Sequence, residues 1–255
     1  MAADDKKIIF SMVGVSKAFT PNKNVLKDIY LSFFYGAKIG IIGLNGSGKS
    51  TLMKVLCGIH HRDAGEIEYF GKKVNFSNIA ESQAAGISII HQELNMMNHL
   101  TVAQNIYIGR EPKMGGVFID DRKMERDAQE LFKRIGIHIN PSVKLGTLTV
   151  GKQQMVEIAK ALSYGARIII MDEPTSAITE AEVEKLFQNI KMLKEQGTGI
   201  IYISHKMDEI FEICDEISVL RDGSLVMTKA SKDTNMNELI SAMVGRSLDN
   251  RFPPV

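Results

Sequence analysis

The sequence has no tryptophan, six prolines and only two cysteines in 255 residues. Cys57 and Cys214 lie far apart and form no C-x-x-C pair, so they indicate neither a disulfide framework nor a zinc site. Few cysteines together with 14 methionines are typical of proteins from a reducing compartment, and we therefore expect a cytoplasmic protein.

An excess of either sign of charge is also missing. The chain has 31 basic and 30 acidic residues, which gives a net charge of +1. A molecule with this balance has no overall field that steers it toward nucleic acid, although a local basic patch is still compatible with it. Nucleic acid is therefore not an expected partner.

Long apolar runs are absent as well. No stretch approaches the roughly 18 apolar residues that a membrane-spanning helix needs. Residues 1–7 are charged and lack the apolar region of a signal peptide. We expect any role at a membrane to come through a partner protein.

The elements that are present alternate between strand and helix. Apolar, β-branched runs predict strands at residues 8–15, 29–34, 38–42, 66–70, 73–76, 87–91, 167–171, 200–203 and, as a hairpin, 217–228. Helical spacing and capping residues predict helices at residues 49–56, after Thr101, and at 121–135, 153–164, 179–196, 206–213 and 237–244. This order is typical of an α/β protein.

The distribution of these elements predicts how the single domain at residues 1–255 is organised. We expect a core from residues 1–92 and 166–245, with a β-rich edge near the N-terminus. The mostly helical stretch at about 93–165 predicts a subdomain inserted into that core, and residues 246–255 read as the start of a linker.

The most specific motif follows the strand predicted at 38–42 and fits G-x-x-x-x-G-K-[ST], the P-loop pattern. Its residues are Gly43, Leu44, Asn45, Gly46, Ser47, Gly48, Lys49, Ser50 and Thr51. Glycines let backbone N–H groups turn toward phosphate oxygens, and the following helix adds a partial positive charge. Lys49 is expected to reach the β- and γ-phosphates of ATP, and the Ser50 hydroxyl to bind Mg²⁺.

A second motif is an apolar strand that ends in two carboxylates, Asp172 and Glu173. By itself, such a pair is often only a solvated strand end. After a P-loop it predicts the acidic element of an ATPase, with Asp172 at the magnesium ion and Glu173 as the general base for the attacking water.

Three further candidates depend more on context. His205 and Gln92 each follow a predicted strand, on the side where open α/β sheets bind ligands. His205 is a candidate donor to the γ-phosphate, and Gln92 a candidate contact of magnesium or water. Phe19 is a candidate to stack on adenine. Taken alone, each fits equally well a surface polar residue or, for Phe19, a core residue.

Together these motifs resemble the ATP-binding cassette (ABC) family over nearly the whole chain. The resemblance implies a P-loop ATPase fold and Mg²⁺-dependent ATP hydrolysis. It makes Gln92 the Q-loop residue, residues 176–179 the D-loop and His205 the switch histidine. It also implies a second cassette, packed head to tail, as a partner that completes the ATP site.

The signature segment of that family corresponds here to residues 148–152. The common form is L-S-G-G-Q, and this chain has Leu148, Thr149, Val150, Gly151 and Lys152. Thr149 keeps a hydroxyl for a γ-phosphate, and Gly151 keeps the close approach of the backbone. Val150 and Lys152 depart from the pattern and predict a weaker half-site.

A narrower resemblance is to the first cassette of bacterial ribose- and galactose-type sugar-import ATPases. It rests on residues 91–95, 150–164, 169–176, 202–216 and 243–253. It implies membrane permease subunits as partners, a sugar-binding protein as an indirect partner, and a place at the inner face of the cell membrane. Those ATPases carry two cassettes in tandem, so we expect a half-length product or a standalone cassette.

Residues 1–54 instead resemble the opening of an ABC-F translation factor, and Leu44 stands where sugar importers usually have Glu. A hybrid of two cassettes is one interpretation, and a ribosome-associated ABC-F ATPase is the alternative function. A nucleotide-binding regulatory cassette is a third possibility, suggested by Val150 and Lys152. Glu173 and His205 favour an active ATPase.

Overall fold

The computed structural model describes residues 8–20, 23–91 and 96–245. Its central sheet contains β3 (Lys38–Ile42), β6 (Ile87–Ile90), β9 (Ile168–Asp172), β10 (Gly199–Ile203), β11 (Glu216–Arg221) and β12 (Ser224–Ala230). The strand order is β12-β11-β3-β10-β9-β6, and all neighbours pair in parallel except β12 with β11. Parallel strands joined through helices confirm the expected α/β class.

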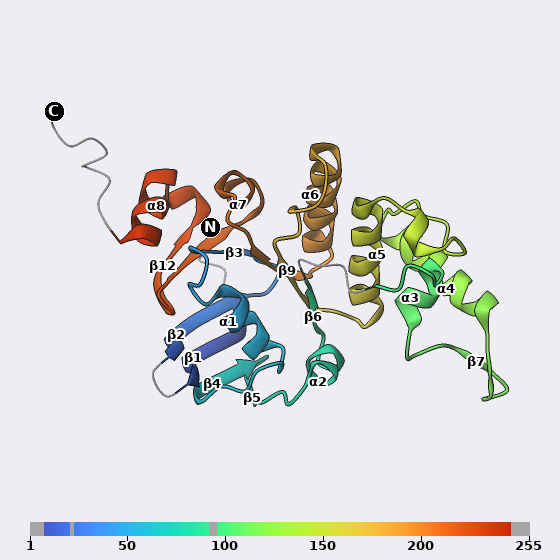
Figure 1. The fold of residues 1–255 in the computed structure, drawn as a ribbon, viewed down its shortest axis with the longest axis horizontal. Helices are drawn as coiled ribbons and strands as arrows, with labels where there is room; N and C mark the ends of the chain where they lie inside the picture. The colour runs from blue at the N-terminus through green and yellow to red at the C-terminus, as the bar shows by residue number, and fades with distance from the viewer. Residues whose placement is uncertain (1–7, 21–22, 92–95, 246–255) are drawn as a thin grey trace, which may run out of the picture.

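A second, antiparallel sheet forms the N-terminal edge of the molecule (Figure 1). Its strands are β1 (Ile8–Thr20), β2 (Lys23–Phe34), β4 (Ala64–Tyr69) and β5 (Lys72–Val74), in the order β2-β1-β4-β5. Helix α1 (Lys49–Leu56) buries Leu52, Met53 and Leu56 in one apolar cluster with residues of both sheets. The expected β-rich edge is therefore packed on the core through the helix that follows the P-loop.

The other face of the central sheet is covered by α6 (Glu180–Glu195), α7 (Met207–Ile213) and α8 (Met236–Val244). Successive side chains of a strand point to opposite faces. Ile168 and Ile170 of β9 accordingly join the cluster around α1, whereas Ile169 and Met171 join the cluster under these helices. Because β9 is buried on both faces, its sequence is a continuous apolar run rather than an alternating one.

Between β6 and β9 the chain forms a helical lobe with a hydrophobic cluster of its own (Figure 1). Its helices are α3 (Val102–Tyr107), α4 (Asp121–Arg134) and α5 (Val150–Ser163), with a short 3-10 turn, η1 (Leu145–Thr147), before α5. The expected face of α4 is buried, including Met124 and Phe132. No helix within the described ranges is both long and apolar enough to cross a bilayer.

Several short elements were not expected from the sequence. They are α2 (Ile79–Ala84), the hairpin strands β7 (Lys113–Met114) and β8 (Phe118–Ile119), and the 3-10 turn η2 (Ser231–Asp233). Each spans only two to six residues, too few for a periodic pattern. Helix α5 also begins at Val150 rather than at residue 153, because Thr149 caps it by accepting a hydrogen bond from the Lys152 N–H.

Candidate functional site

The candidate site lies at the carboxyl edge of the central sheet. The P-loop follows β3, Asp172 ends β9, and His205 comes two residues after β10, which lies between those two strands. Because parallel strands end at the same edge, residues that are 120 or more positions apart in the sequence are brought to one place.

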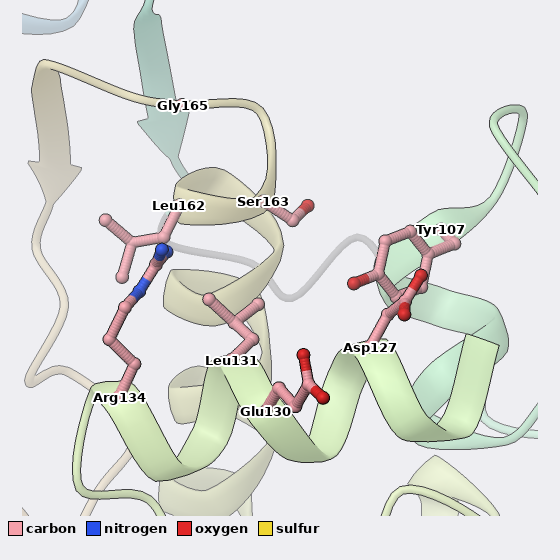
Figure 2. Close-up of a pocket in the computed structure, with 8 residues that line it drawn as sticks. All are labelled: Tyr107, Asp127, Glu130, Leu131, Arg134, Leu162, Ser163 and Gly165. Atoms are coloured by element: carbon pink, nitrogen blue, oxygen red, sulfur yellow. The ribbon is translucent and has the colours of Figure 1, made fainter. Parts of the chain in front are cut away.

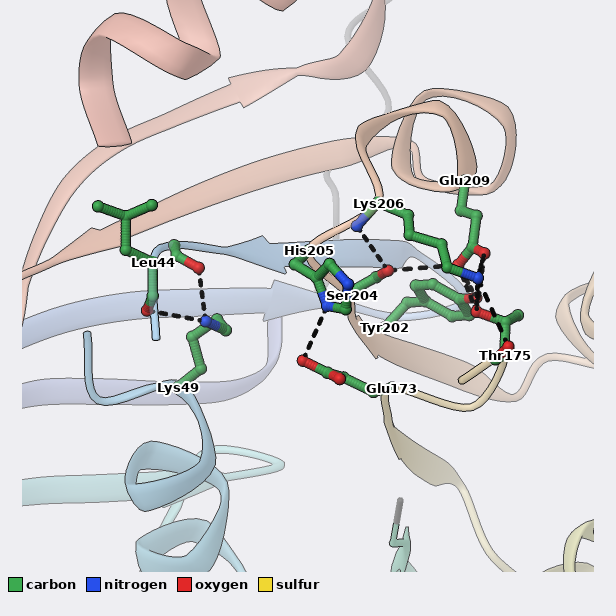
Figure 3. A network of polar contacts seen from close by, with 10 residues as sticks. Leu44, Lys49, Glu173, Thr175, Tyr202, Ser204, His205, Lys206 and Glu209 are labelled. Atoms are coloured by element: carbon green, nitrogen blue, oxygen red, sulfur yellow. Dashed lines mark hydrogen bonds and ion pairs between the residues drawn. The ribbon is translucent and has the colours of Figure 1, made fainter. Parts of the chain in front are cut away.

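The side chain of Lys49 hydrogen-bonds the backbone at the start of the P-loop. Lys49 is 7% exposed, and its Nζ donates to the Gly43 carbonyl at 2.6 Å and to the Leu44 carbonyl at 3.1 Å (Figure 3). Burial lowers the pKa of Lys49, while the carboxylates of Glu173 and Asp172 act in the opposite direction. The ammonium group is thus close to the acidic strand end and has loop carbonyls as its partners.

Two glycines of the loop are required by geometry. A Cβ at Gly43 would lie 2.3 Å from the Leu220 carbonyl oxygen. Gly48 has a φ of 102°, and a Cβ there would lie 2.8 Å from the Val25 carbonyl oxygen. The loop therefore packs closely against β2 and the β11–β12 hairpin, whose turn residue Gly223 donates to the Ser47 carbonyl.

A cleft of about 400 Å³ opens at the loop. Its lining consists of Val25, residues 45–51 and Glu173. The Ser47 hydroxyl lies in this lining, is buried, and has no hydrogen-bond partner among the described residues. A buried polar atom without a partner costs free energy, and a phosphate oxygen would satisfy it. The cleft thus has the chemistry of a phosphate site.

Asp172 and Ser50 meet beside the P-loop. The Ser50 hydroxyl hydrogen-bonds the Asp172 carboxylate. Burial raises the pKa of Asp172, and this hydrogen bond opposes the increase. A hydroxyl beside a partly buried carboxylate is a pair of hard oxygen ligands, which fits Mg²⁺.

Glu173 and His205 are in direct contact. The Nδ1 of His205 lies 3.1 Å from Oε1 of Glu173 (Figure 3). Glu173 has a left-handed backbone, with a φ of 49°, and its N–H donates to the Ile203 carbonyl at 2.9 Å. A non-glycine residue in this conformation stores strain, a feature that concentrates at functional sites. The backbone bond ties this strained position to the end of β10.

The segment 148–152 spans the start of α5. Thr149 donates from Oγ1 to Oε1 of Glu182 at 2.8 Å, and Gly151 hydrogen-bonds the same carboxylate through its backbone. Glu182 also completes a capping box with Thr179 at the start of α6. One carboxylate therefore joins the N-termini of two helices, and a Cβ at Gly151 would lie 2.5 Å from it.

Two of the predicted residues remain apart from this description. Gln92 lies outside the described residues, so its predicted role is not tested. Phe19 is 50% exposed near the end of β1 and stacks edge-on against His60, with ring centroids 5.0 Å apart. Among the described residues, the lining of the P-loop cleft contains Val25 but not Phe19.

A polar network beside His205, buried except for Lys206, was not singled out by the sequence analysis. It contains Thr175, Tyr202, Ser204, Lys206 and Glu209, from three different segments (Figure 3). All five lie within residues 169–176 and 202–216, which carry the sugar-import resemblance, but no motif assigned them a role. The i to i+3 spacing of Lys206 and Glu209, which form an ion pair, was a local signal available in the sequence.

Two larger hollows lie away from this edge. One, of about 510 Å³, lies between α4 and the end of α5 (Figure 2). It is lined by Tyr107, Asp127, Glu130, Leu131, Arg134, Leu162, Ser163 and Gly165. The other, of about 700 Å³, is lined by parts of residues 34–37, 211–216 and 230–232, and by Lys194. Neither contains the P-loop or the acidic strand end.

Known protein families and relatives match the chain over most of its length. The family model described as ABC transporter matches residues 26–176. A galactose/methyl galactoside import ATP-binding protein of Photobacterium profundum is 49% identical over 249 residues, which cover 97% of this chain and 50% of that protein. A putative ribose/galactose/methyl galactoside import ATP-binding protein of Burkholderia cenocepacia is 51% identical, over 96% of this chain and 48% of that protein. The chain thus spans about half the length of these curated relatives.

Solved structures match the fold. A nucleotide-free ATP-binding cassette from an ABC transporter aligns with a TM-score of 0.79 at 23% identity, over 97% of this chain and all of that one. A dimeric cassette in a post-hydrolysis state, bound to ADP and phosphate, aligns with a TM-score of 0.73 at 24% identity, over 87% and 98%. The likeness extends from the central sheet to the helical lobe.

Proposed function

This chain belongs to the ABC transporter family, and we propose that it binds and hydrolyses ATP to energise a membrane sugar importer of the ribose or galactose type. The observation that supports the ATPase most directly is the meeting of the P-loop, Asp172, Glu173 and His205 at one edge of the sheet. The sugar-importer assignment is supported by relatives that are about half identical over nearly the whole chain.

ATP binding is assigned to residues 43–51. The backbone N–H groups of the loop and the buried Ser47 hydroxyl would receive phosphate oxygens. Lys49 would exchange its two carbonyl contacts for the β- and γ-phosphates. Phe19 is proposed to stack on the adenine, from β1.

Magnesium is assigned to Ser50 and Asp172, with Gln92 as a third contact inferred from the sequence. When bound, Mg²⁺ would neutralise charge on the phosphates. The hydrogen bond between Ser50 and Asp172 holds the two oxygen groups close together.

The hydrolytic step is assigned to Glu173 and His205. Glu173 would accept a proton from water while the water oxygen bonds to the γ-phosphorus and the bond to the β–γ bridging oxygen breaks, so that ADP and phosphate leave. His205 would donate a hydrogen bond to a γ-phosphate oxygen. Its Nδ1 contact with Glu173 links His205 to a side chain that lines the P-loop cleft.

A second cassette is the proposed partner for catalysis. Leu148, Thr149, Val150, Gly151 and Lys152 would face the nucleotide of that partner, head to tail. In this reading residues 1–255 form one nucleotide-binding domain, with the inserted helical subdomain at about 93–165 and a linker from 246. Closure of the two cassettes would drive the permease, and hydrolysis would reset it.

The permease contact is assigned to the helical lobe near Gln92. The hollow between α4 and α5 lies in this lobe and presents apolar, acidic and basic groups together, including Leu131, Glu130 and Arg134 (Figure 2). Such a mixed surface suits a protein partner better than RNA, which requires clustered basic residues. Through the permease the chain would lie at the inner face of the cell membrane, and the sugar-binding protein would act only indirectly.

The test uses the Glu173→Gln variant to distinguish a membrane permease from the ribosome as the partner of this chain. Glu173→Gln protein with ATP is sedimented with purified ribosomes and, separately, with vesicles that contain ribose- or galactose-type permease subunits. We expect ATP-dependent retention on the permease vesicles and none on empty vesicles or ribosomes. Stoichiometric ribosome binding that weakens steeply with salt would replace the transporter assignment by the translation-factor one.

A further inference from the structure

We propose that Glu209 is a positioning residue for ATP hydrolysis, which holds the segment carrying His205 against the segment carrying Glu173. The inference rests on the proposed ATPase function and adds to it a residue outside the cleft. Glu209 lies in α7, four residues after His205, and is 9% exposed.

The need for such a residue arises from the exposure of His205. Its side chain is 57% exposed, so packing does not fix the ring in place. Glu173, with a side chain 18% exposed, is better enclosed. The 3.1 Å contact between them therefore depends on how the two backbone segments are held relative to each other.

Glu209 contacts both of these segments. On the Glu173 side, the Oγ1 of Thr175 donates to the Glu209 carboxylate at 2.7 and 2.9 Å. On the His205 side, the Ser204 hydroxyl lies 3.3 Å from Oε2, and Lys206 Nζ lies 3.1 Å from Oε1. The residues immediately before and after His205 are thus both tied to one carboxylate.

The remaining contacts make this carboxylate rigid. The Tyr202 hydroxyl donates to Oε2 at 2.8 Å, and burial beside the carboxylate raises the pKa of Tyr202, so that it remains a donor. The Lys206 N–H donates to the Ser204 hydroxyl, and Lys206 Nζ to Thr175 Oγ1 (Figure 3). A buried carboxylate that is satisfied by several donors has little freedom to move.

Errors of about 1 Å in the placement of a catalytic group can reduce a rate by about 10²-fold. Glu209 contacts neither the P-loop nor the cleft lining among the described residues. Its loss should therefore reduce turnover while leaving nucleotide affinity intact. A role in stability alone would not produce this separation.

The experiment measures kcat and ATP dissociation constants for the parent, Glu209→Gln, His205→Ala and the double variant. We expect Glu209→Gln to lower kcat by roughly 10- to 100-fold with a dissociation constant within about twofold of the parent. In the His205→Ala background the same substitution should have almost no further effect, because it acts through His205.

Glu157→Gln is the matched control, since Glu157 is equally buried, at 9%, but lies in α5 of the helical lobe. It should leave kcat near the parent value. If Glu209→Gln does not fold, Thr175→Val replaces it, because this change of similar shape removes the donor to Glu209 on the Glu173 side, together with the acceptor for Lys206 Nζ.

Each outcome decides the inference. Parent-like kcat in Glu209→Gln or Thr175→Val, or losses that multiply with His205→Ala, would overturn the positioning role. A loss of kcat in Glu157→Gln as large as that in Glu209→Gln would assign the effect to stability and would also overturn the positioning role. Absence of turnover in the parent would instead overturn the proposed ATPase function, and the inference with it.

Discussion

At the scale of single residues, the candidate site brings the Lys49 ammonium group close to the Asp172 and Glu173 carboxylates in a partly buried environment. Burial lowers the pKa of Lys49 and raises that of Asp172, so each charged form is disfavoured by its surroundings. The nearby carboxylates and the Ser50 hydroxyl offset part of this cost. Such residues destabilise the folded protein, and under the proposed function ATP and Mg²⁺ would supply their missing partners.

Glu173→Gln should separate binding from turnover. The amide keeps the shape of the side chain but cannot accept the proton of the attacking water, so we expect ATP binding to be retained and turnover to fall by roughly 10²- to 10⁴-fold. Lys49→Ala is the contrasting variant, because it removes the charge at the phosphates and should weaken binding itself. Phosphate release and binding of a fluorescent ATP analogue measure the two effects, and turnover at the parent rate would remove Glu173 from the role of base.

Asp172→Asn should stabilise the free protein in a pH-dependent way. A folded-state pKa raised above the ordinary value of 3.8 means that the carboxyl supports folding only when protonated, and that this support is lost as pH rises through the folded pKa. At pH 7 the neutral amide should therefore raise Tm, where each 1 kcal/mol corresponds to roughly 2–4 °C. The gain in Tm should shrink as pH falls toward about 4. An equal gain at pH 7 and at pH 4 would contradict a raised pKa of Asp172 in the folded protein.

At the scale of elements, Glu182 couples the starts of α5 and α6. Its carboxylate accepts from the Thr149 hydroxyl and from the Thr179 backbone, so the segment 148–152 and the residues after Glu173 are held together. The helix N-termini favour a negative charge at this point, and the Thr179 N–H is the main cause of the lowered pKa of Glu182.

Glu182→Ala should cost about 1 kcal/mol of unfolding free energy, the usual value of a helix cap, because it removes one side of the capping box and the bond to Thr149. Thermal unfolding measures the loss. Glu180→Ala is the control, since Glu180 is exposed in the same first turn of α6 without these contacts. Equal losses in the two variants would show that the charge, and not the link to α5, stabilises this region.

At the scale of the whole molecule, one chain offers one P-loop and one segment 148–152. If the ATP site needs this segment from a second cassette, the isolated chain should be a monomer without nucleotide and a weak ATPase. Its specific activity should rise with protein concentration, as measured by phosphate release together with gel filtration. Brisk turnover that is strictly proportional to protein concentration down to nanomolar levels would show that no second cassette is needed.

The sequence by itself determined the parts of this protein that depend on neighbouring residues. The glycines at 43 and 48, Lys49 and the following helix are local requirements of the P-loop, and the apolar run before Asp172 reflects a strand buried on both faces. Capping pairs such as Thr179 with Glu182 were also visible, because their partners are three residues apart.

Only the tertiary structure decided which of these parts meet. The contact of His205 with Glu173 exists because β9 and β10 are adjacent and parallel, and that order is a property of the whole sheet. Glu182 reaches Thr149, and Glu209 reaches Thr175, across more than 30 residues of sequence. A hydrogen bond acts over about 3 Å in space regardless of its separation along the chain, so no spacing rule could predict these links.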